Sequence, residues 1–114
     1  MRIDHVLLIV LCALGARSAS AVERFIGFNE TASTVFTGVY LAPHSSGAWG
    51  ANEALNDKDH VWDAGERLII GDVSRGIFDL KVVDRTGRVC YKYGIDLTKD
   101  KTFDIRDDDL RDCK

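Results

Sequence analysis

Alternating apolar and polar residues over two neighbouring segments predict a pair of β-strands. The first segment reads Phe-Asp-Leu-Lys-Val over residues 78–82, and the second reads Val-Cys-Tyr-Lys-Tyr-Gly-Ile over residues 89–95. A period of two places successive side chains on opposite faces of a strand. The connection contains Gly87, which suits a hairpin turn that needs a residue at positive φ. We therefore expect Cys90 on the polar face of its strand, opposite a core-facing set formed by Val89, Tyr91, Tyr93 and Ile95.

Four further segments have strand-like patterns, at residues 24–28, 34–42, 67–72 and 102–106. About six or seven short strands separated by Gly, Asn and Asp turns are typical of an all-β sandwich. No repeat, low-complexity tract or linker interrupts residues 22–114. The pattern therefore predicts one domain over 22–114, a small antiparallel β-sandwich with an acidic C-terminal tail.

One connection, residues 47–65, is long for so small a domain. Such a connection is usually either functional or held in place by its own aromatic residues. Trp49 and Trp62 lie near its two ends. Each tryptophan either fills an edge of the core or, as the alternative, serves as an aromatic anchor for a protein partner. Three of its acidic residues, Asp57, Asp59 and Asp63, are ordinary turn formers or, as the alternative, lend ligands to a shared surface site.

The first 21 residues have the features of a secretory signal peptide. A short basic start precedes an apolar run over residues 6–14, and Ala19-Ser20-Ala21 forms an A-x-A cleavage site. The apolar run is roughly half the length that a membrane-spanning helix needs. We therefore expect a periplasmic or secreted protein without a membrane span.

Removal of the leader removes Cys12 and leaves two cysteines, Cys90 and Cys113. An oxidising compartment favours an intramolecular disulfide between them over free thiols or an intermolecular link. With Cys90 on the polar face of its strand, the disulfide would hold the C-terminal tail across the outside of the sheet.

Composition and charge exclude several classes of protein. A hydrophobic content of 46% excludes a disordered chain, and 10 Gly with one Pro exclude a collagen-like stalk. The formal net charge is −3 and no basic run occurs. Binding to nucleic acid or to an anionic membrane surface is therefore not expected.

Catalytic motifs are also missing from the sequence. The two histidines after the leader, His44 and His60, lie in predicted loops, and no serine has a nucleophile-elbow context. The sequence has no glycine-rich phosphate loop and no His/Cys spacing typical of zinc. We therefore predict a protein that is not an enzyme.

Aspartates are concentrated near the C-terminus. Five lie within nine residues and two stand just upstream: Asp104, Asp107, Asp108, Asp109 and Asp112, then Asp96 and Asp100. Several carboxylate oxygens together suit a hard cation such as Ca²⁺ or a trivalent lanthanide, which would relieve their mutual repulsion. The alternative is a solvated tail in which residues 107–109 cap a short terminal helix, with Arg111 as an ion-pair partner.

Several short motifs resemble a known family. They occur in order within residues 25–97: Phe28-Asn29-Glu30-Thr31, Val39-Tyr40-Leu41-Ala42-Pro43, Trp49-Gly50, Ala64-Gly65-Glu66, Phe78-Asp79-Leu80-Lys81-Val82-Val83-Asp84 and Gly94-Ile95-Asp96-Leu97. Together they resemble small exported bacterial β-sandwich-like domains of uncharacterised function. The resemblance implies a sandwich fold and export, and it implies no catalytic residues. Two features depart from it, since the family usually has Pro-Gly-Glu at 64–66 and lacks the acidic tail.

Two functions are compatible with these patterns. The first is a periplasmic binding protein or carrier that takes a hard cation through its aspartates, with a metal-linked homodimer if open coordination positions join two copies. The second is a metal-independent interaction module that docks another periplasmic protein through the 47–65 connection and its tryptophans. A sequon at Asn29-Glu30-Thr31 also allows two interpretations, a glycosylation site or a turn whose side chains bond local backbone.

Overall fold

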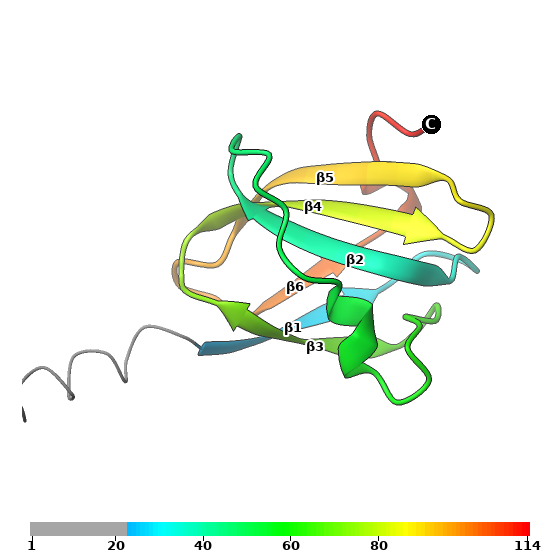
Figure 1. Ribbon diagram of the computed structural model, residues 1–114, viewed down its shortest axis with the longest axis horizontal. Coiled ribbons are helices and arrows are strands. Elements are labelled where there is room, and N and C mark those ends of the chain that lie inside the picture. The colour runs from blue at the N-terminus through cyan, green and yellow to red at the C-terminus, as the bar shows by residue number, and fades with distance from the viewer. Residues whose placement is uncertain (1–22) are drawn as a thin grey trace, which may run out of the picture.

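The protein is an all-β sandwich of two three-stranded sheets (Figure 1). The computed structural model describes residues 23–114, so the predicted signal peptide lies outside the described residues. In chain order the elements are β1 (Glu23–Asn29), β2 (Phe36–Pro43), the 3₁₀ helix η1 (Glu53–Asn56), β3 (Arg67–Val73), β4 (Ile77–Asp84), β5 (Val89–Asp96), β6 (Thr102–Ile105) and the 3₁₀ helix η2 (Asp107–Asp109). The predicted fold class is confirmed. No helix within residues 23–114 is long and apolar enough to cross a bilayer.

The two sheets differ in how their strands run. Sheet A has the order β3-β1-β6, in which β1 is antiparallel to β3 but parallel to β6. Sheet B has the order β2-β4-β5 and is antiparallel throughout. The parallel β1–β6 pair is a departure from the antiparallel sandwich that the sequence predicted.

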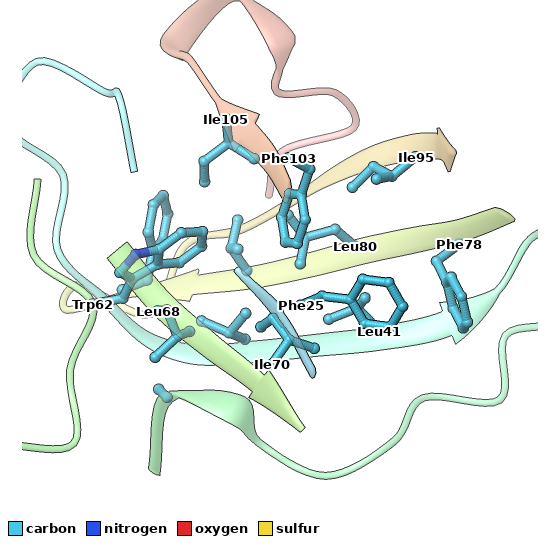
Figure 2. Packing of buried hydrophobic residues seen from close by; sticks show 14 of the residues in the cluster. Phe25, Leu41, Trp62, Leu68, Ile70, Phe78, Leu80, Ile95, Phe103 and Ile105 are labelled. Atoms are coloured by element: carbon cyan, nitrogen blue, oxygen red, sulfur yellow. The ribbon is translucent and has the colours of Figure 1, made fainter. Parts of the chain in front are cut away.

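The core lies between the two sheets and is built from the inward-facing residues of each strand. Phe25 and Ile70 come from sheet A, while Leu80 and Val82 come from sheet B, and all four are fully buried. Trp62 joins them from the connection before β3 (Figure 2). The period of two in the sequence follows from this arrangement, because each strand turns one of its two faces towards the core.

A bulge in β5 reverses the predicted orientation of its side chains. Leu80 pairs with Lys92, but Phe78 pairs with Ile95, so two residues of β5 oppose one of β4. The extra residue is accommodated at Gly94, whose φ of 71° favours glycine. Before the bulge, Cys90 therefore faces the core.

The placement of Val89, Tyr91 and Tyr93 on the core face was wrong for the same reason. Tyr91 and Tyr93 lie on the outer face of sheet B, whereas Ile95, beyond the bulge, is buried as expected. Uninterrupted alternation from 89 to 95 cannot hold in a strand that contains an extra residue.

The 47–65 connection covers one edge strand of each sheet, β2 in sheet B and β3 in sheet A (Figure 1). The Asn52 side chain accepts a hydrogen bond from the Val39 amide at 2.9 Å and donates one to the Thr37 carbonyl at 3.0 Å. On β3, Asn56 donates to the Ile69 carbonyl and the buried carboxylate of Glu53 accepts from the Gly71 amide, each at 2.9 Å. Side chains thus replace the missing neighbouring strand, which protects the edges from pairing with another chain.

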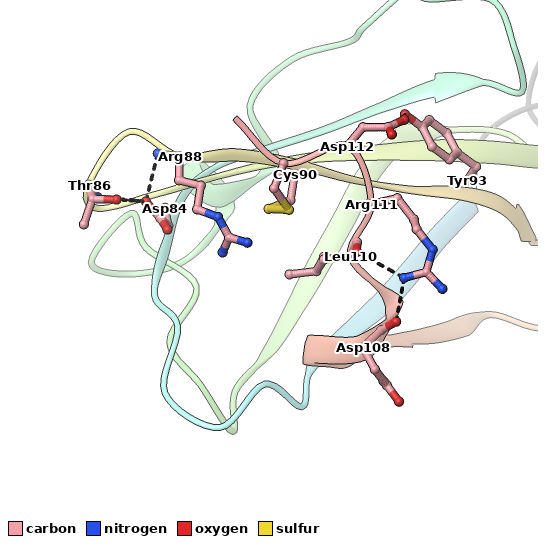
Figure 3. The surroundings of a disulfide bond; sticks show 10 residues. Asp84, Thr86, Arg88, Cys90, Tyr93, Asp108, Leu110, Arg111 and Asp112 are labelled. Atoms are coloured by element: carbon pink, nitrogen blue, oxygen red, sulfur yellow. Dashed lines mark hydrogen bonds between the residues drawn. A yellow bond between two sulfur atoms is a disulfide. The ribbon is translucent and has the colours of Figure 1, made fainter.

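The C-terminal tail extends sheet B at its other edge. Backbone hydrogen bonds of 2.8–3.0 Å join Arg111 to Tyr91 and Lys114 to Val89. The predicted disulfide, Cys90–Cys113, is formed between the tail and β5 (Figure 3). Its position requires a correction. Cys90 is only 2% exposed and belongs to the core cluster, so the disulfide lies against the core and does not cross the outside of the sheet.

Candidate functional site

The tail aspartates do not converge on a common point. Asp107 accepts a hydrogen bond from the Ala32 amide at 2.9 Å, and Asp112 accepts one from the Tyr93 hydroxyl at 2.6 Å. Asp109 accepts from Lys92 Nζ at 3.1 Å and from the Arg106 amide at 2.9 Å. These carboxylates therefore satisfy separate partners on different parts of the fold.

The remaining predicted ligands are similarly dispersed. Asp104 pairs with Arg106 at 3.1 Å, and Asp96 accepts hydrogen bonds from the Thr98 amide and hydroxyl. Asp100 and Asp108 are exposed. Among the side chains that the structure describes, no group of three or more His, Cys, Asp or Glu is arranged to hold a metal ion.

Local partners already stabilise the negative charge of two tail carboxylates. The hydrogen bond from Arg106 holds the pKa of Asp104 below its ordinary value, although burial opposes this. At Asp109 burial opposes ionisation, but the Arg106 amide and Lys92 outweigh it and lower the pKa. The protein's own donors and cations thus perform the role for which the sequence suggested a metal ion.

Residues 107–109 form the short helix η2, as the alternative interpretation of the tail expected. The Asp109 carboxylate accepts a hydrogen bond from the Arg106 amide that precedes the helix. Arg111 does not form the expected ion pair. Its guanidinium donates instead to the carbonyls of Asp108 and Leu110 (Figure 3).

A row of aromatic side chains crosses the outer face of sheet B. We call it the aromatic strip and define it as Tyr40 on β2, Lys81 on β4, Tyr91 and Tyr93 on β5, and Trp49 from the 47–65 connection. Tyr91 lies 5.8 Å from Trp49 and 5.8 Å from Tyr93 between ring centroids. Lys81 Nζ lies 5.2 Å from the centroid of Trp49 and 4.8 Å from that of Tyr40. The members therefore form one continuous series of contacts across all three strands.

The aromatic strip is accessible to solvent, and neighbouring residues position the tyrosines at its two ends. Tyr93 is 45% exposed, and the other members are half-buried. The Tyr40 ring lies over Gly38, where an added Cβ would come within 2.9 Å of the ring. At the opposite end, the hydrogen bond to Asp112 raises the pKa of Tyr93 to about 12, so its hydroxyl stays neutral.

A buried aspartate of β4 fixes the start of the segment that carries Trp49. Asp79 is 5% exposed and accepts hydrogen bonds from His44 Nδ1 at 2.7 Å, the Ser45 amide at 2.8 Å and the Gly94 amide at 3.0 Å. Gly50 then donates to the Leu41 carbonyl at 2.9 Å. The start of the connection is thereby held to β2, β4 and the β5 bulge, which places Trp49 over the sheet.

Asp79 gives the fold a defined dependence on acid. Burial opposes ionisation of Asp79, but the hydrogen bonds from His44, Ser45 and Gly94 outweigh it and lower the pKa below 3.8. A lowered folded-state pKa stabilises the fold above the unfolded-state pKa, and this contribution is lost as the pH falls through the folded-state pKa. We expect the stability difference between the wild type and Asp79→Asn to shrink as the pH falls below about 4. Urea unfolding at decreasing pH measures this difference, and a difference that is already lost above about pH 4 would contradict the lowered pKa of Asp79.

The two tryptophans have different environments. Trp49 belongs to the strip, whereas Trp62 is fully buried, packs against Phe36 with ring centroids 6.0 Å apart, and donates from Nε1 to the Glu66 carbonyl at 3.0 Å. The predicted interaction role of Trp62 must therefore be corrected, because its ring offers no surface to a partner.

The side chains of His44 and Ser46 have local hydrogen-bond partners, whereas His60 is exposed. His44 is bound to Asp79, His60 lies in an exposed turn at a φ of 63°, and Ser46 Oγ accepts a hydrogen bond from the Ala48 amide. The expectation that the protein is not an enzyme stays a prediction.

The sequon asparagine has a structural role. Asn29 is fully buried, its Nδ2 donates to the carbonyls of Thr34 and Trp62, and its Oδ1 accepts from the amide and hydroxyl of Thr31. These contacts match the turn interpretation of the segment.

Comparison with other proteins adds no family assignment. No protein-family model matches the chain, and neither curated proteins nor solved structures show a significant match. The resemblance to a family of exported bacterial domains stays a prediction.

Proposed function

We propose that the protein is an exported, metal-independent binding protein that recognises its ligand through the aromatic strip. The observation that carries this proposal is the continuity of the strip, from Tyr40 across Lys81 and Trp49 to Tyr91 and Tyr93. Aromatic rings offer a large apolar contact area at small cost in conformational entropy, and tyrosine and tryptophan dominate the binding energy of many interfaces. The Cys90–Cys113 disulfide supports export to an oxidising compartment.

Rigid support of the strip favours a binding role. Its strand residues lie on hydrogen-bonded β2, β4 and β5, and Asp79 fixes the connection that carries Trp49. A site whose side chains are held before the ligand arrives loses less entropy on binding.

The geometry gives less support to the alternative function, in which the protein carries a hard cation. Asp107 is hydrogen-bonded to the loop after β1, whereas Asp109 and Asp112 are bonded to Lys92 and Tyr93, which lie on opposite faces of β5. A hard cation requires several oxygens at about 2.3–2.6 Å, so binding would have to break these contacts first. A metal-linked homodimer would have the same requirement.

Both functions can be tested by one set of NMR titrations. We expect a cell-envelope extract of the source organism, separated into protein and glycan fractions, to shift the amide signals of Tyr40, Trp49, Lys81 and Tyr91 in the presence of EDTA. Trp49→Ala should weaken the response while leaving the remaining spectrum folded. Lys58→Gln, which changes an exposed residue of the same connection, is the matched control.

The titrations also define the contrary result. Shifts confined to residues 104–112 that require added Ca²⁺ or La³⁺, and that disappear in Asp109→Asn, would support the cation carrier and overturn the strip as the binding site. An unchanged spectrum with every fraction would overturn the proposed function as well.

A further inference from the structure

Lys81 and Lys92 are the two half-buried cations among the side chains that the structure describes. Lys92 forms an ion pair with Asp109 at 3.1 Å. Lys81 is half-buried, and among the side chains that the structure describes no carboxylate forms an ion pair with it. Its ammonium contacts the faces of Tyr40 and Trp49 instead.

This environment favours an anion in the ligand. The rings remove part of the water around the ammonium and return only part of the lost solvation through cation–π attraction. A carboxylate that approached from solvent would form a charge-assisted hydrogen bond with Lys81 Nζ at the centre of the strip. Charge complementarity therefore selects an acidic ligand.

The covered edges of sheet B indicate how the ligand is recognised. Asn52 occupies backbone groups of β2, and the tail residues Arg111 and Lys114 occupy those of β5. A peptide cannot add as a further strand where the edge groups already have partners. Recognition therefore falls to the side chains of the outer face.

The dimensions and chemistry of the strip suit a short chain of sugar rings. The strip crosses β2, β4 and β5, and neighbouring strands lie about 4.8 Å apart, so its span is on the order of 10 Å. A six-membered sugar ring has an apolar C–H face that stacks on an aromatic ring, and its hydroxyls can bond the phenolic groups of Tyr91 and Tyr93. A sugar acid adds the carboxylate that Lys81 selects.

We propose that the aromatic strip binds an acidic oligosaccharide, with a hexuronate carboxylate on Lys81 and the sugar rings against Trp49 and Tyr91. This inference rests on the proposed function, since it names the ligand class of the same site. Asp112 lies at the Tyr93 end of the strip and repels negative charge there. The carboxylate therefore lies nearer to Lys81 than to Tyr93.

Isothermal titration calorimetry with galacturonic acid oligomers tests the proposal directly. EDTA is present, and the methyl ester of the same oligomers serves as the uncharged ligand, which differs from the acid by one methyl group on each carboxyl. We expect the acid to bind the wild type about tenfold more tightly than the ester, which corresponds to one charge-assisted hydrogen bond. Lys81→Gln should remove this preference, and Lys58→Gln should keep it.

The possible results distinguish an error in the proposed ligand class from an error in the proposed binding site. Equal affinity for acid and ester in the wild type overturns the role of Lys81 without depending on the folding of any variant. If neither oligomer binds but the envelope protein fraction still shifts the strip signals, the saccharide proposal is wrong and the proposed function stands. If no ligand or fraction affects the strip, both proposals fail.

Discussion

Replacement of Cys113 by serine is expected to lower the free energy of unfolding by about 3 kcal/mol. The disulfide joins residues 23 positions apart, and opening it lets the unfolded chain sample many more conformations. For a domain of this size the loss amounts to a decrease in Tm of roughly 12–24 °C. Urea unfolding and thermal melting of the variant, compared with the oxidised wild type, measure the effect.

Hydrogen exchange of the amides that bond the C-terminal tail tests the effect of the disulfide at individual residues. The amides of Val89 and Tyr91 donate to the carbonyls of Lys114 and Arg111, so their hydrogen exchange should become faster in Cys113→Ser. Exchange in the middle of β4 should accelerate only by the global loss of stability. Cys90→Ser is the matched variant, and it should cost more because it places a hydroxyl in the core beside Val82. Equal stability of the oxidised wild type and Cys113→Ser would contradict a stabilising role of the disulfide.

The positions of the strands could be predicted because each strand buries one face. The predicted segments around residues 78–82 and 102–106 lie on β4 and β6, and in both the apolar residues face the core. The parallel pairing of β1 with β6 could not be predicted in this way, since alternation identifies a buried face but not the neighbouring strand.

The orientation of side chains in β5 depended on a single glycine. Alternation places Tyr91 and Tyr93 on one face of β5 and Cys90 and Lys92 on the other, but it does not say which face is buried. The bulge at Gly94 decides that Cys90 and Lys92 face inward. A glycine directly before the last apolar residue of a strand pattern is the sequence signal for such a bulge. That signal would also have placed the tyrosines on the surface, where they complete the aromatic strip.

The functions of the 47–65 connection could not be separated by sequence. Asn52, Glu53 and Asn56 close the edges of β2 and β3, an arrangement that exists only after both sheets have formed. In the same way, the aspartates near the C-terminus are close in sequence, but their side chains bond to Ala32 in the loop after β1 and to Lys92 and Tyr93 on opposite faces of β5. Proximity in sequence therefore overestimated their ability to form one site.

Substitution of Trp62 should mainly reduce stability, whereas substitution of Trp49 should mainly reduce ligand binding. Trp62→Ala is expected to cost about 3–5 kcal/mol of unfolding free energy, because it removes a fully buried indole that packs against Phe36 and bonds the Glu66 carbonyl. Trp49→Ala removes a half-buried ring on the outer face and should cost at most about 1 kcal/mol. Urea unfolding followed by circular dichroism measures both variants with the same probe.

Replacement of each tryptophan by phenylalanine provides the matched conservative variants. Trp62→Phe keeps much of the buried area and should recover a large part of the stability lost in Trp62→Ala, whereas Trp49→Phe should be as stable as the wild type. Ligand binding should follow the reverse order, with Trp49→Ala folded but defective and Trp62→Phe nearly unchanged in affinity. A Trp49→Ala protein that unfolds as readily as Trp62→Ala would show that the strip is held for stability and would contradict its assignment as a binding surface. Two residues thirteen positions apart in one connection thus separate the requirement for folding from the requirement for recognition.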